Sequence, residues 1–405
     1  MTVLLWIAVA ALAVWVWLLL GQGFFWRTDV RLPDRADPPS WPSVAVVVPA
    51  RDEAEVLPLS LPSLLTQDYP GRAEVFLIDD GSGDGTGELA RELAAREAGR
   101  GGLPLTVDSP GEPEPGWTGK LWAVRHGMAL ARARTDAEYL LLTDADIAHE
   151  PDSLRELVRA ATSTGADLVS QMARLRVATF WERLVVPAFV YFFAQLYPFR
   201  WVNRPRCRTA AAAGGCVLLR REAAERARVP ESIRQAVIDD VALARAVKRS
   251  GAAGAPGDGR RRGGGRIWLG LAERVDSVRP YPGLGELWRM VSRSAYAQLR
   301  HSPLLLVGTV VGLAVIYLAP PVATCAGALT EHGALFAVGA AAWLMMAGSY
   351  LPMLRYYRQT VWLAPLLPFV AVLYLLMTVD SAVRHHRGHG AAWKGRTYRR
   401  PTTAP

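Results

Sequence analysis

Long uncharged stretches constrain this chain most, because a segment that crosses a lipid bilayer must satisfy its own backbone hydrogen bonds and is therefore helical. Such stretches cover residues 3–20, 303–329, 334–354 and 360–379. Each approaches or exceeds the ~20 apolar residues that cross a hydrocarbon core of about 30 Å. We therefore expect an N-terminal transmembrane anchor at 1–22 and about three transmembrane helices within 303–380.

The orientation of these segments follows from the basic residues beside them. The first stretch is not typical of a cleaved signal peptide, because no basic segment precedes it and no clear small-x-small site follows it. Arg27, Arg31 and Arg35 come soon after it, so the positive-inside rule places the next domain in the cytoplasm. Three later crossings would put the C-terminus outside, whereas the basic tail at 381–405 prefers the inside. The number of complete crossings stays open, because a Pro-interrupted late stretch can fail to cross or can be re-entrant.

The cysteine and arginine contents indicate which kinds of ligand and surface this chain can bind. Three cysteines, Cys207, Cys216 and Cys325, are too few and too scattered for a disulfide framework or a zinc site, which fits a reducing cytoplasmic face. The arginines behind the net charge of +9 gather at the membrane flanks and in GRRRGGGR at 259–266. We expect them to meet an anionic membrane surface and not nucleic acid.

Short apolar segments alternate with helical patterns between residues 43 and 169. SVAVVVPA precedes EVLPLSLPSLLTQ, AEVFLIDD precedes GELARELAAREAG, and EYLLLTDAD precedes PDSLRELVRAATSTG. This alternation predicts an α/β class, with a doubly wound and mostly parallel sheet, inside a soluble domain at 43–300. In such sheets ligands bind outside the carboxyl ends of the strands.

Two segments of this domain have a different character. Residues 180–201 are apolar and aromatic but contain Glu182, Arg183 and two prolines. They predict an interfacial helix or helix pair lying on the membrane, with a fifth span or a buried helix as the alternative. Residues 251–265 are rich in Gly and Arg, which predicts a flexible loop.

Acids or special turns follow three predicted strands, in PARDE at 49–53, DDGSGDGT at 79–86 and DAD at 144–146. The glycine-rich segment does not fit a dinucleotide site, because Thr86 stands in place of the third glycine and the neighbouring aspartates would repel a pyrophosphate. Carboxylates at strand ends can instead receive the N–H and ribose hydroxyl groups of a nucleotide.

The DAD segment is a candidate metal site. Period 2 would place Asp144 and Asp146 on one strand face, so that both could reach a single ion or its water shell. Mg²⁺ or Mn²⁺ suits such an oxygen-only site. A bare D-x-D also occurs by chance or as a turn.

The order of the segments is more specific than any one of them. VVVPARDE, IDDGSGDGT, GWTGK at 116–120, LLTDAD and IDD at 238–240 together resemble the family 2 glycosyltransferases of the GT-A fold, over about residues 44–300. The resemblance implies a nucleotide-sugar donor bound with Mg²⁺ or Mn²⁺ at the strand ends. By it, Asp146 is the metal ligand. The donor-binding residues implied are Pro49, Glu53, Asp79, Asp80, Lys120, Asp144 and Arg293.

The resemblance also implies a catalytic base at Asp240, with Asp239 beside it. The acceptor hydroxyl must lose its proton as it attacks the anomeric carbon opposite the departing nucleoside diphosphate. A positioned carboxylate accelerates such a step by about 10²- to 10⁴-fold, and in-line displacement inverts the anomeric centre. The alternative is that Asp240 only N-caps the helix VALARAVKRSG, which would lower its pKa, whereas a nearby diphosphate would raise it.

Two further segments bear on the reaction. GELWRMVSRSAYAQLR at 285–300 lies where processive members of the family carry Q-x-x-R-W, but MVSRS lacks both the Gln and the Trp. Arg293 is either a diphosphate ligand or a basic residue at the membrane edge, and the departure favours a single transfer over chain elongation. AAAAGGCVLLRR at 210–221 resembles the small-residue segment that lets the acceptor approach the donor, or is a tightly packed strand and turn.

The layout of the chain narrows the resemblance. One anchor, a GT-A domain, late spans and WKGRTY at 393–398 resemble the lipid glycosyltransferases near ceramide glucosyltransferase, and most of all the bacterial hopene-associated glycosyltransferases. This implies a multi-pass protein of the bacterial inner membrane that transfers one sugar, for example from a UDP-sugar, to a hydroxyl of a membrane lipid such as a hopanoid. The alternatives are a processive polysaccharide synthase and a non-catalytic scaffold that binds nucleotide sugar or lipid; a scaffold would not need Asp240.

Overall fold

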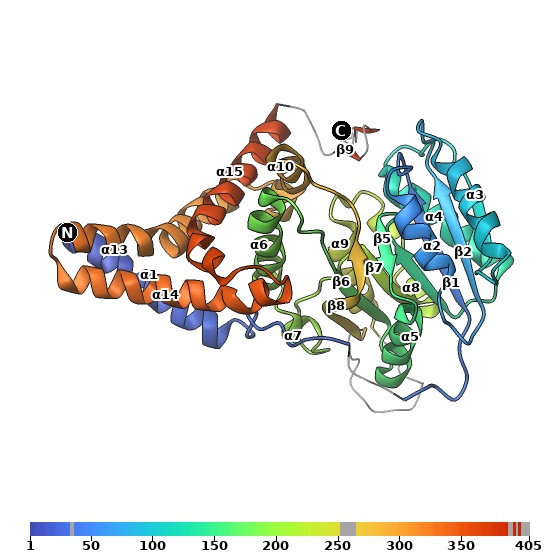
Figure 1. Cartoon of the computed structure of the whole chain (residues 1–405), viewed down its shortest axis with the longest axis horizontal. Helices are drawn as coiled ribbons and strands as arrows, with labels where there is room; N and C mark the ends of the chain where they lie inside the picture. Colours follow the sequence, from blue (N-terminus) through green and yellow to red (C-terminus); the bar gives the residue numbers. More distant parts are fainter. Residues whose placement is uncertain (33–35, 252–264, 388–391, 394–395, 398–405) are drawn as a thin grey trace, which may run out of the picture. The chain divides into compact units, whose positions relative to one another are not determined.

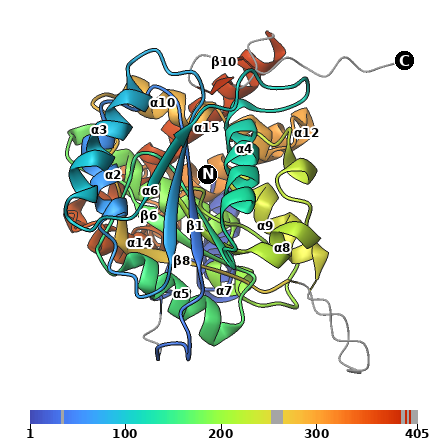
Figure 2. The same cartoon turned by 90° about the vertical axis from the view of Figure 1, so that its right-hand side faces the viewer.

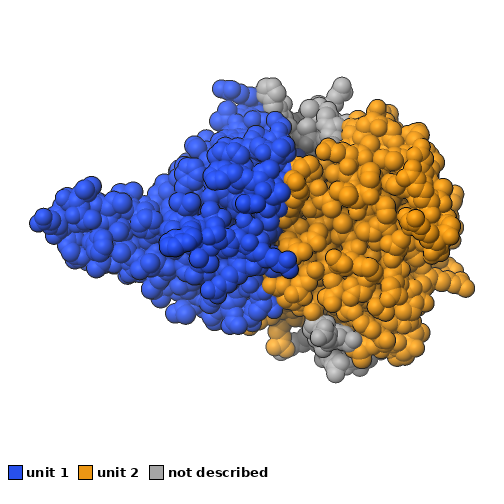
Figure 3. Space-filling view, viewed as in Figure 1, with its two compact units in different colours: residues 1–29, 177–200, 281–391 blue, residues 30–176, 201–280, 392–405 orange. Residues whose placement is uncertain are grey.

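The computed structural model describes residues 1–32, 36–251, 265–387, 392–393 and 396–397 (Figure 1). The chain divides into two compact units, coloured separately in Figure 3. Unit 1 comprises Met1–Asp29, Val177–Arg200 and Tyr281–Ala391, and unit 2 comprises Val30–Arg176, Trp201–Pro280 and Ala392–Pro405. Nearly all of the predicted loop at 251–265 and most of the tail after residue 387 lie outside the described residues.

Unit 2 is built on an eight-stranded sheet in the order β3-β2-β1-β4-β7-β6-β8-β5. The strands are β1 (Val44–Ala50), β2 (Ala73–Asp79), β3 (Leu105–Asp108), β4 (Tyr139–Thr143), β5 (Ile147–His149), β6 (Leu168–Arg174), β7 (Cys216–Arg220) and β8 (Ile267–Ser277). Strands β3, β2, β1 and β4 are parallel, whereas β7 is antiparallel to both of its neighbours and β5 is antiparallel to β8. The predicted α/β class is confirmed, with a sheet that is parallel in its first half and mixed in its second.

Helices cover both faces of this sheet, as Figure 2 shows for α2 and α3 on one side of β1 and α4 on the other. The helices of unit 2 are α2 (Leu57–Leu65), α3 (Thr86–Ala98), α4 (Gly119–Arg134), α5 (Ser153–Thr164), α8 (Arg221–Arg226), the 3₁₀ turn η1 (Glu231–Ile233) and α9 (Asp239–Ser250). A short helix, α7 (Phe199–Val202), lies at the chain boundary between the units, and β9 (Ala392–Trp393) pairs with β10 (Arg396–Thr397).

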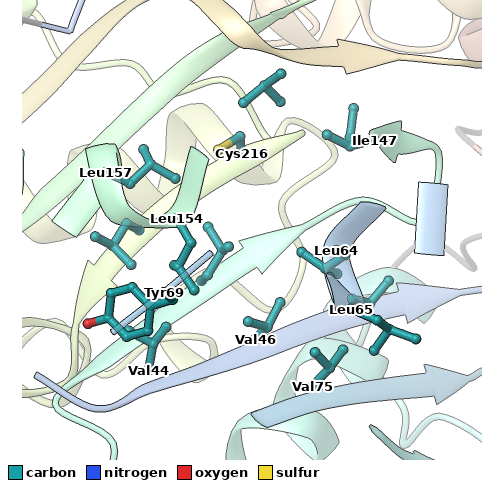
Figure 4. Close-up of a cluster of buried hydrophobic side chains, with 14 of the residues drawn as sticks. Val44, Val46, Leu64, Leu65, Tyr69, Val75, Ile147, Leu154, Leu157 and Cys216 are labelled. Carbon is teal, nitrogen blue, oxygen red and sulfur yellow. The ribbon is translucent and has the colours of Figure 1, made fainter. Parts of the chain in front are cut away.

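The apolar sequence of β1 explains its central place, because all seven of its residues are buried. On one face, Val44 and Val46 pack in a cluster with side chains of α2 and α5 (Figure 4). On the other face α4 lies very close, and a Cβ added at Gly127 would be only 2.5 Å from Cγ1 of Val47. A glycine at this position therefore lets α4 approach the sheet closely.

Unit 1 is helical and includes the four helices that are long and apolar enough to cross a membrane, at Thr2–Gly21, Pro303–Leu329, Gly333–Tyr356 and Val361–His386. Its helices are α1 (Thr2–Gly21), α6 (Phe180–Leu196), α10 (Leu284–Ser292), α11 (Ala295–Gln298), α12 (Pro303–Leu313), α13 (Ala319–Leu329), α14 (Gly333–Tyr356) and α15 (Leu367–His386). A π-helical turn, η2 (Ala314–Leu318), joins α12 to α13, and a 3₁₀ turn, η3 (Val361–Leu366), precedes α15. One N-terminal and three C-terminal apolar helices agree with the prediction.

The π-helical turn has a local cause. Pro320 has no N–H to donate to the carbonyl of Ile316, four residues earlier. The indole Nε1 of Trp15 donates to that carbonyl instead, at 2.8 Å. Within unit 1 the N-terminal helix thus satisfies a backbone group that a proline leaves open.

The aromatic segment predicted to lie on the membrane forms the helix α6. It begins with a capping box in which Thr179 and Glu182 exchange hydrogen bonds, so Glu182 satisfies backbone N–H groups and is buried. Farther along, the hydroxyl of Tyr191 bonds to that of Ser349 in α14 at 2.7 Å, and the hydroxyl of Tyr374 in α15 donates to a carbonyl of α6. These contacts fit the buried-helix alternative within unit 1, and contact with the membrane surface stays a prediction.

Candidate active site

The carboxyl ends of β1, β2 and β4 meet at one edge of the sheet in unit 2. Strand β1 pairs in parallel with β2, with Ala50 opposite Asp79, and in parallel with β4, with Val47 opposite Leu142. The three acidic segments that follow these strands are therefore neighbours, as their sequence positions predict.

The DAD segment does not have the predicted geometry. Strand β4 ends at Thr143, and Asp144 to Asp146 form a tight turn in which the N–H of Ile147 donates to the carbonyl of Asp144 at 3.2 Å. Ala145 is buried, and its carbonyl accepts from the hydroxyl of Ser60 at 2.5 Å. The expectation that Asp144 and Asp146 share one strand face was wrong, because the chain turns here into the short strand β5. Asp144 pairs with Lys120, whereas Asp146 pairs with Arg279.

Lys120 connects Asp144 to the acidic start of α9. Its Nζ lies 2.9 Å from Oδ1 of Asp144 and 3.1 Å from Oδ2 of Asp239. The position of Lys120 in the first turn of α4 follows from the N-cap Thr118, whose side chain accepts from the N–H of Leu121. Burial alone would lower the pKa of Lys120, but the charges of Asp144 and Asp239 outweigh burial and raise it. The ammonium group therefore stays charged.

Asp240 lies inside the first turn of α9 and not at its N-cap, which is Ile238. Its Oδ2 accepts from the N–H of Gly214 at 3.0 Å, and its Oδ1 accepts from the N–H of Val241 at 2.7 Å. Burial, followed by the charge of Asp239, raises the pKa of Asp240 to about 7. The alternative of a capping carboxylate with a lowered pKa is therefore wrong in position and in sign.

A small pocket is lined by both charged and apolar side chains. Its lining includes Pro49, Lys120, Asp144, Asp239 and Asp240, together with Gly214. The apolar part of the lining includes Leu121, Val124, Leu142, Val217, Val229 and Leu243. Of the predicted site residues, Pro49 and these four charged residues line one pocket. The small-residue segment at 210–221 contributes Gly214 to the same lining.

The two acids that end β2 differ in exposure. Asp80 is completely buried, and its carboxylate pairs with the guanidinium of Arg51 at 3.6 Å. Asp79 is partly exposed, and its Oδ1 accepts from the N–H of Ser82 at 3.0 Å. Of the two predicted donor contacts, Asp79 is thus the one that faces outward, whereas Asp80 supports the loop.

The loops after β1 and β2 are joined by reciprocal hydrogen bonds. The N–H of Gly83 donates to Oδ1 of Asp52 at 2.9 Å, and the N–H of Ala54 donates to Oδ2 of Asp84 at 3.0 Å. Asp52 adopts a positive φ of 51°, a conformation that costs energy in a non-glycine residue. Asp84, one of the aspartates that argue against a dinucleotide site, therefore holds the loop after β1 against the loop after β2.

Arg279, which follows β8, is the main residue that sequence reasoning missed. Its Nη2 lies 2.6 Å from Oε2 of Glu53, and its Nε lies 3.0 Å from Oδ2 of Asp146. The same oxygen of Asp146 accepts from the hydroxyl of Ser277 at 3.1 Å. Glu53, predicted to bind the donor, is buried and anchors this arginine. The sequence SVRP around Arg279 carries no pattern that predicts the pairing.

His149 was also missed, although it lies three residues after the DAD segment. Its Nε2 is 3.0 Å from the hydroxyl of Thr143, and its Nδ1 is 3.2 Å from the hydroxyl of Ser153. The hydroxyl of Thr143 donates to the carbonyl of Gly215 at 2.8 Å. Burial lowers the pKa of His149 to about 4, so the ring is neutral and acts here as a hydrogen-bonding strut.

The oxygen atoms of the DAD turn fit a hard divalent cation in type. Lys120 pairs with Oδ1 of Asp144, and Arg279 and Ser277 bind Oδ2 of Asp146, so these contacts use one oxygen of each carboxylate. No group of three or more His, Cys, Asp or Glu side chains in the described part of the chain is arranged to hold a metal alone. A metal at this turn would therefore take its other ligands from phosphate and water.

Arg293 belongs to unit 1, where it follows α10 as the C-cap residue. All other predicted site residues belong to unit 2. A role for Arg293 in binding diphosphate stays a prediction.

The sequence of this domain matches a known protein family. Residues 45–228 match the model described as Glycosyl transferase family 2. The chain contains a family 2 glycosyltransferase domain. The matched region includes Lys120, Asp144 and Asp146, whereas Asp239, Asp240 and Arg279 lie beyond it.

Among curated proteins, the chain is 35% identical over 105 residues to 4,4'-diaponeurosporenoate glycosyltransferase of Staphylococcus haemolyticus, a match that covers 26% of this chain and 24% of that protein. It is 31% identical over 145 residues to polyprenol monophosphomannose synthase of Mycolicibacterium smegmatis, covering 35% of this chain and 50% of that protein. The chain thus spans half or less of the length of these relatives.

A solved structure extends the likeness in fold to nearly the whole chain. The mannosyltransferase PcManGT from Pyrobaculum calidifontis, in complex with GDP-Man and Mn²⁺, is similar with a TM-score of 0.56 and 21% identity. The match covers 94% of this chain and 99% of that chain. At this identity the likeness concerns the fold, and with the sheet order it identifies the predicted GT-A fold of the family 2 glycosyltransferase domain.

Proposed function

We propose that this protein is an inverting, metal-dependent glycosyltransferase that moves one sugar from a nucleotide-diphosphate sugar to a hydroxyl of a membrane lipid. The observation that carries the proposal is that Asp240 lines the same pocket as Lys120 and Asp144 and that burial raises its pKa to about 7. A general base works best when its pKa lies near the working pH. A non-catalytic nucleotide-sugar binder would have no use for such a group.

The charges of the site support a divalent cation as part of the donor complex. Lys120 bridges Asp144 and Asp239, and Arg279 bridges Glu53 and Asp146, so each of these two cations is shared by two carboxylates. A diphosphate would add more negative charge. Mg²⁺ or Mn²⁺ held by Asp146, with Asp144 beside it, would supply the missing positive charge and stabilise the departing diphosphate.

The residues of the chain then have separate roles. Asp240 accepts the proton of the acceptor hydroxyl while the hydroxyl oxygen bonds to the anomeric carbon. The bond from that carbon to the diphosphate oxygen breaks, and its electron pair leaves with the nucleoside diphosphate. Lys120 holds Asp144 and Asp239 in place and offers its charge to the diphosphate, and Asp79 contacts the nucleoside.

The presence of a general base at Asp240 favours a hydroxyl acceptor over a phosphate acceptor. Some relatives are named for phosphate-bearing lipids, as in undecaprenyl-phosphate mannosyltransferase of Micrococcus luteus. A phosphate monoester has a second pKa of about 6 and is already anionic near pH 7, so its oxygen needs no base. A lipid hydroxyl does need one.

The four apolar helices support a lipid acceptor and a multi-pass protein. The arginines after the first helix support a cytoplasmic catalytic domain. The inner membrane of a bacterium is the location that the resemblance to bacterial lipid glycosyltransferases implies. Among lipids, a hopanoid is the acceptor implied by the resemblance to hopene-associated glycosyltransferases, which rests on WKGRTY and the layout of the chain.

The proposal is tested by measuring nucleoside diphosphate release from UDP-, GDP- and TDP-sugars by the full chain purified in detergent. Each donor is supplied with and without membrane lipid extract, and with and without EDTA. We expect release that needs both the lipid and the metal. Folded protein that releases nothing from any donor would favour the non-catalytic scaffold.

A further inference from the structure

Arg279 pairs with Asp146, the carboxylate that we assign as the metal ligand. The guanidinium of Arg279 donates through Nε to Oδ2 of Asp146 at 3.0 Å and pairs with Oε2 of Glu53 at 2.6 Å. Only 13% of the Asp146 side chain and 7% of the Glu53 side chain are exposed. The pairing is therefore shielded from solvent and is stronger than an ordinary surface ion pair.

A divalent ion on Asp146 would lie close to this guanidinium, and two positive charges at such a distance in a poorly solvated site repel each other strongly. The negative charge of Glu53 offsets part of the repulsion, but Glu53 is already matched by Arg279. The free protein thus satisfies Asp146 with its own cation and weakens its affinity for a metal.

Arg279 is also suited to a second partner. A guanidinium binds two oxygens of a phosphate as readily as those of a carboxylate, because its planar fork fits both. Arg279 lies two residues after the end of β8, and 25% of its side chain is exposed, so its guanidinium can turn without unfolding a strand. Glu53 stays in contact as an anchor, because it comes from the fixed loop after β1.

We propose that Arg279 is an exchangeable counter-ion of the donor site: it pairs with Asp146 in the free protein and passes to the diphosphate when donor and metal bind together. The inference rests on the proposed function, since it takes Asp146 as the metal ligand. It explains how a site rich in carboxylates avoids holding a metal without a donor. It also predicts that metal and nucleotide strengthen each other's binding.

The test uses the full chain in detergent and measures binding, not turnover. Mn²⁺ binding without nucleotide is followed from the electron paramagnetic resonance signal of the free ion, and binding of UDP and GDP at saturating Mn²⁺ is followed by calorimetry. We expect Arg279→Met to bind Mn²⁺ at least ~10-fold more tightly than the wild type and to bind the preferred nucleotide at least ~10-fold more weakly, as loss of a charge-assisted contact implies. Arg279→Lys, which keeps the charge, is the matched control and should stay near the wild type in Mn²⁺ affinity.

A second variant identifies the ion's position. Asp146→Asn combined with Arg279→Met should lose the gained Mn²⁺ affinity. The opposite signs of the two effects separate this role from a structural one, because a strut that only shapes the site would weaken both ligands when removed. Unchanged or weaker Mn²⁺ binding in Arg279→Met would overturn the inference, as would a gain that survives the Asn substitution. In either case, lipid- and EDTA-dependent donor cleavage by the wild type would leave the proposed function standing.

Discussion

The raised pKa of Asp240 makes a prediction about the pH dependence of transfer. Burial raises the pKa of this carboxyl group and the charge of Asp239 raises it further, whereas the charge of Lys120 and two backbone N–H donors lower it. If Asp240 is the base, kcat/KM requires its ionised form and falls below pH 7. Activity should drop about tenfold per pH unit there, to about 1% of its maximum at pH 5.

Substituting Asp239 or Lys120 should move the acidic limb of the pH profile, the range in which activity falls below pH 7, in opposite directions. A unit charge within about 4–6 Å shifts a carboxyl pKa by roughly one to three units. Asp239 keeps 26% of its side chain exposed and Lys120 keeps 20%, so solvent screening favours the lower end of that range. We expect Asp239→Asn to move the limb down by about one pH unit and Lys120→Met to move it up by about one.

The assay is kcat/KM for donor cleavage between pH 5 and 9, with metal and lipid extract held constant. The readout is the pH of half-maximal activity, which is independent of how far each variant lowers the maximum. Glu92→Gln, at an exposed position on α3, is the control and should leave the limb in place. A limb that stays near pH 7 in both variants, or that moves the same way in both, would refute the assignment of the titrating group to Asp240.

Four further outcomes follow from the same site and fold. Asp240→Asn should lower turnover at least ~100-fold with nearly unchanged donor affinity, measured by steady-state kinetics and nucleotide binding, as loss of a general base implies. The same variant should unfold at a higher temperature than the wild type at pH 8 but not at pH 4. The sign follows because a carboxyl whose pKa is raised from 3.8 to about 7 in the folded state binds more protons folded than unfolded, so stability is lost as pH rises through this window. Gly127→Ala should destabilise the protein by about 1–3 kcal/mol in thermal unfolding, because the new Cβ would lie 2.5 Å from Val47 and 2.9 Å from a carbon of Ile78. Asp146→Ala should weaken Mn²⁺-dependent donor binding in calorimetry, and donor affinity in this variant that is unchanged from the wild type, both with and without metal, would remove Asp146 from the metal site.

The sequence predicts the edge of the sheet at which the site lies, for a physical reason. Parallel strands share a carboxyl edge, so acids that follow β1, β2 and β4 must be neighbours whatever their side chains do. The uniformly buried β1 and the apolar lengths of the four long helices are similarly direct consequences of composition. These features depend on the local pattern alone.

Features that depend on distant partners could not be predicted. Strand β4 is shorter than its apolar run implies, because β5 pairs with β8, more than a hundred residues later, and draws the chain into a turn at Asp146. The pairing of Glu53 with Arg279 links residues 226 positions apart. The contact of Gly214 with Asp240 depends on the path of an irregular segment. None of these contacts leaves a local periodicity in the sequence.

The central claim is transfer of a single sugar to a lipid hydroxyl, and the chemical identity of the lipid product tests it most directly. The full chain is incubated with its preferred donor, Mn²⁺ and membrane lipid extract, and the glycosylated lipid is isolated for mass spectrometry before and after mild acid. The account predicts a lipid that has gained one sugar residue and no phosphate, joined by a glycosidic bond that survives the acid. A sugar–phosphate lipid that the acid cleaves, or a polymer of many sugars, would contradict it.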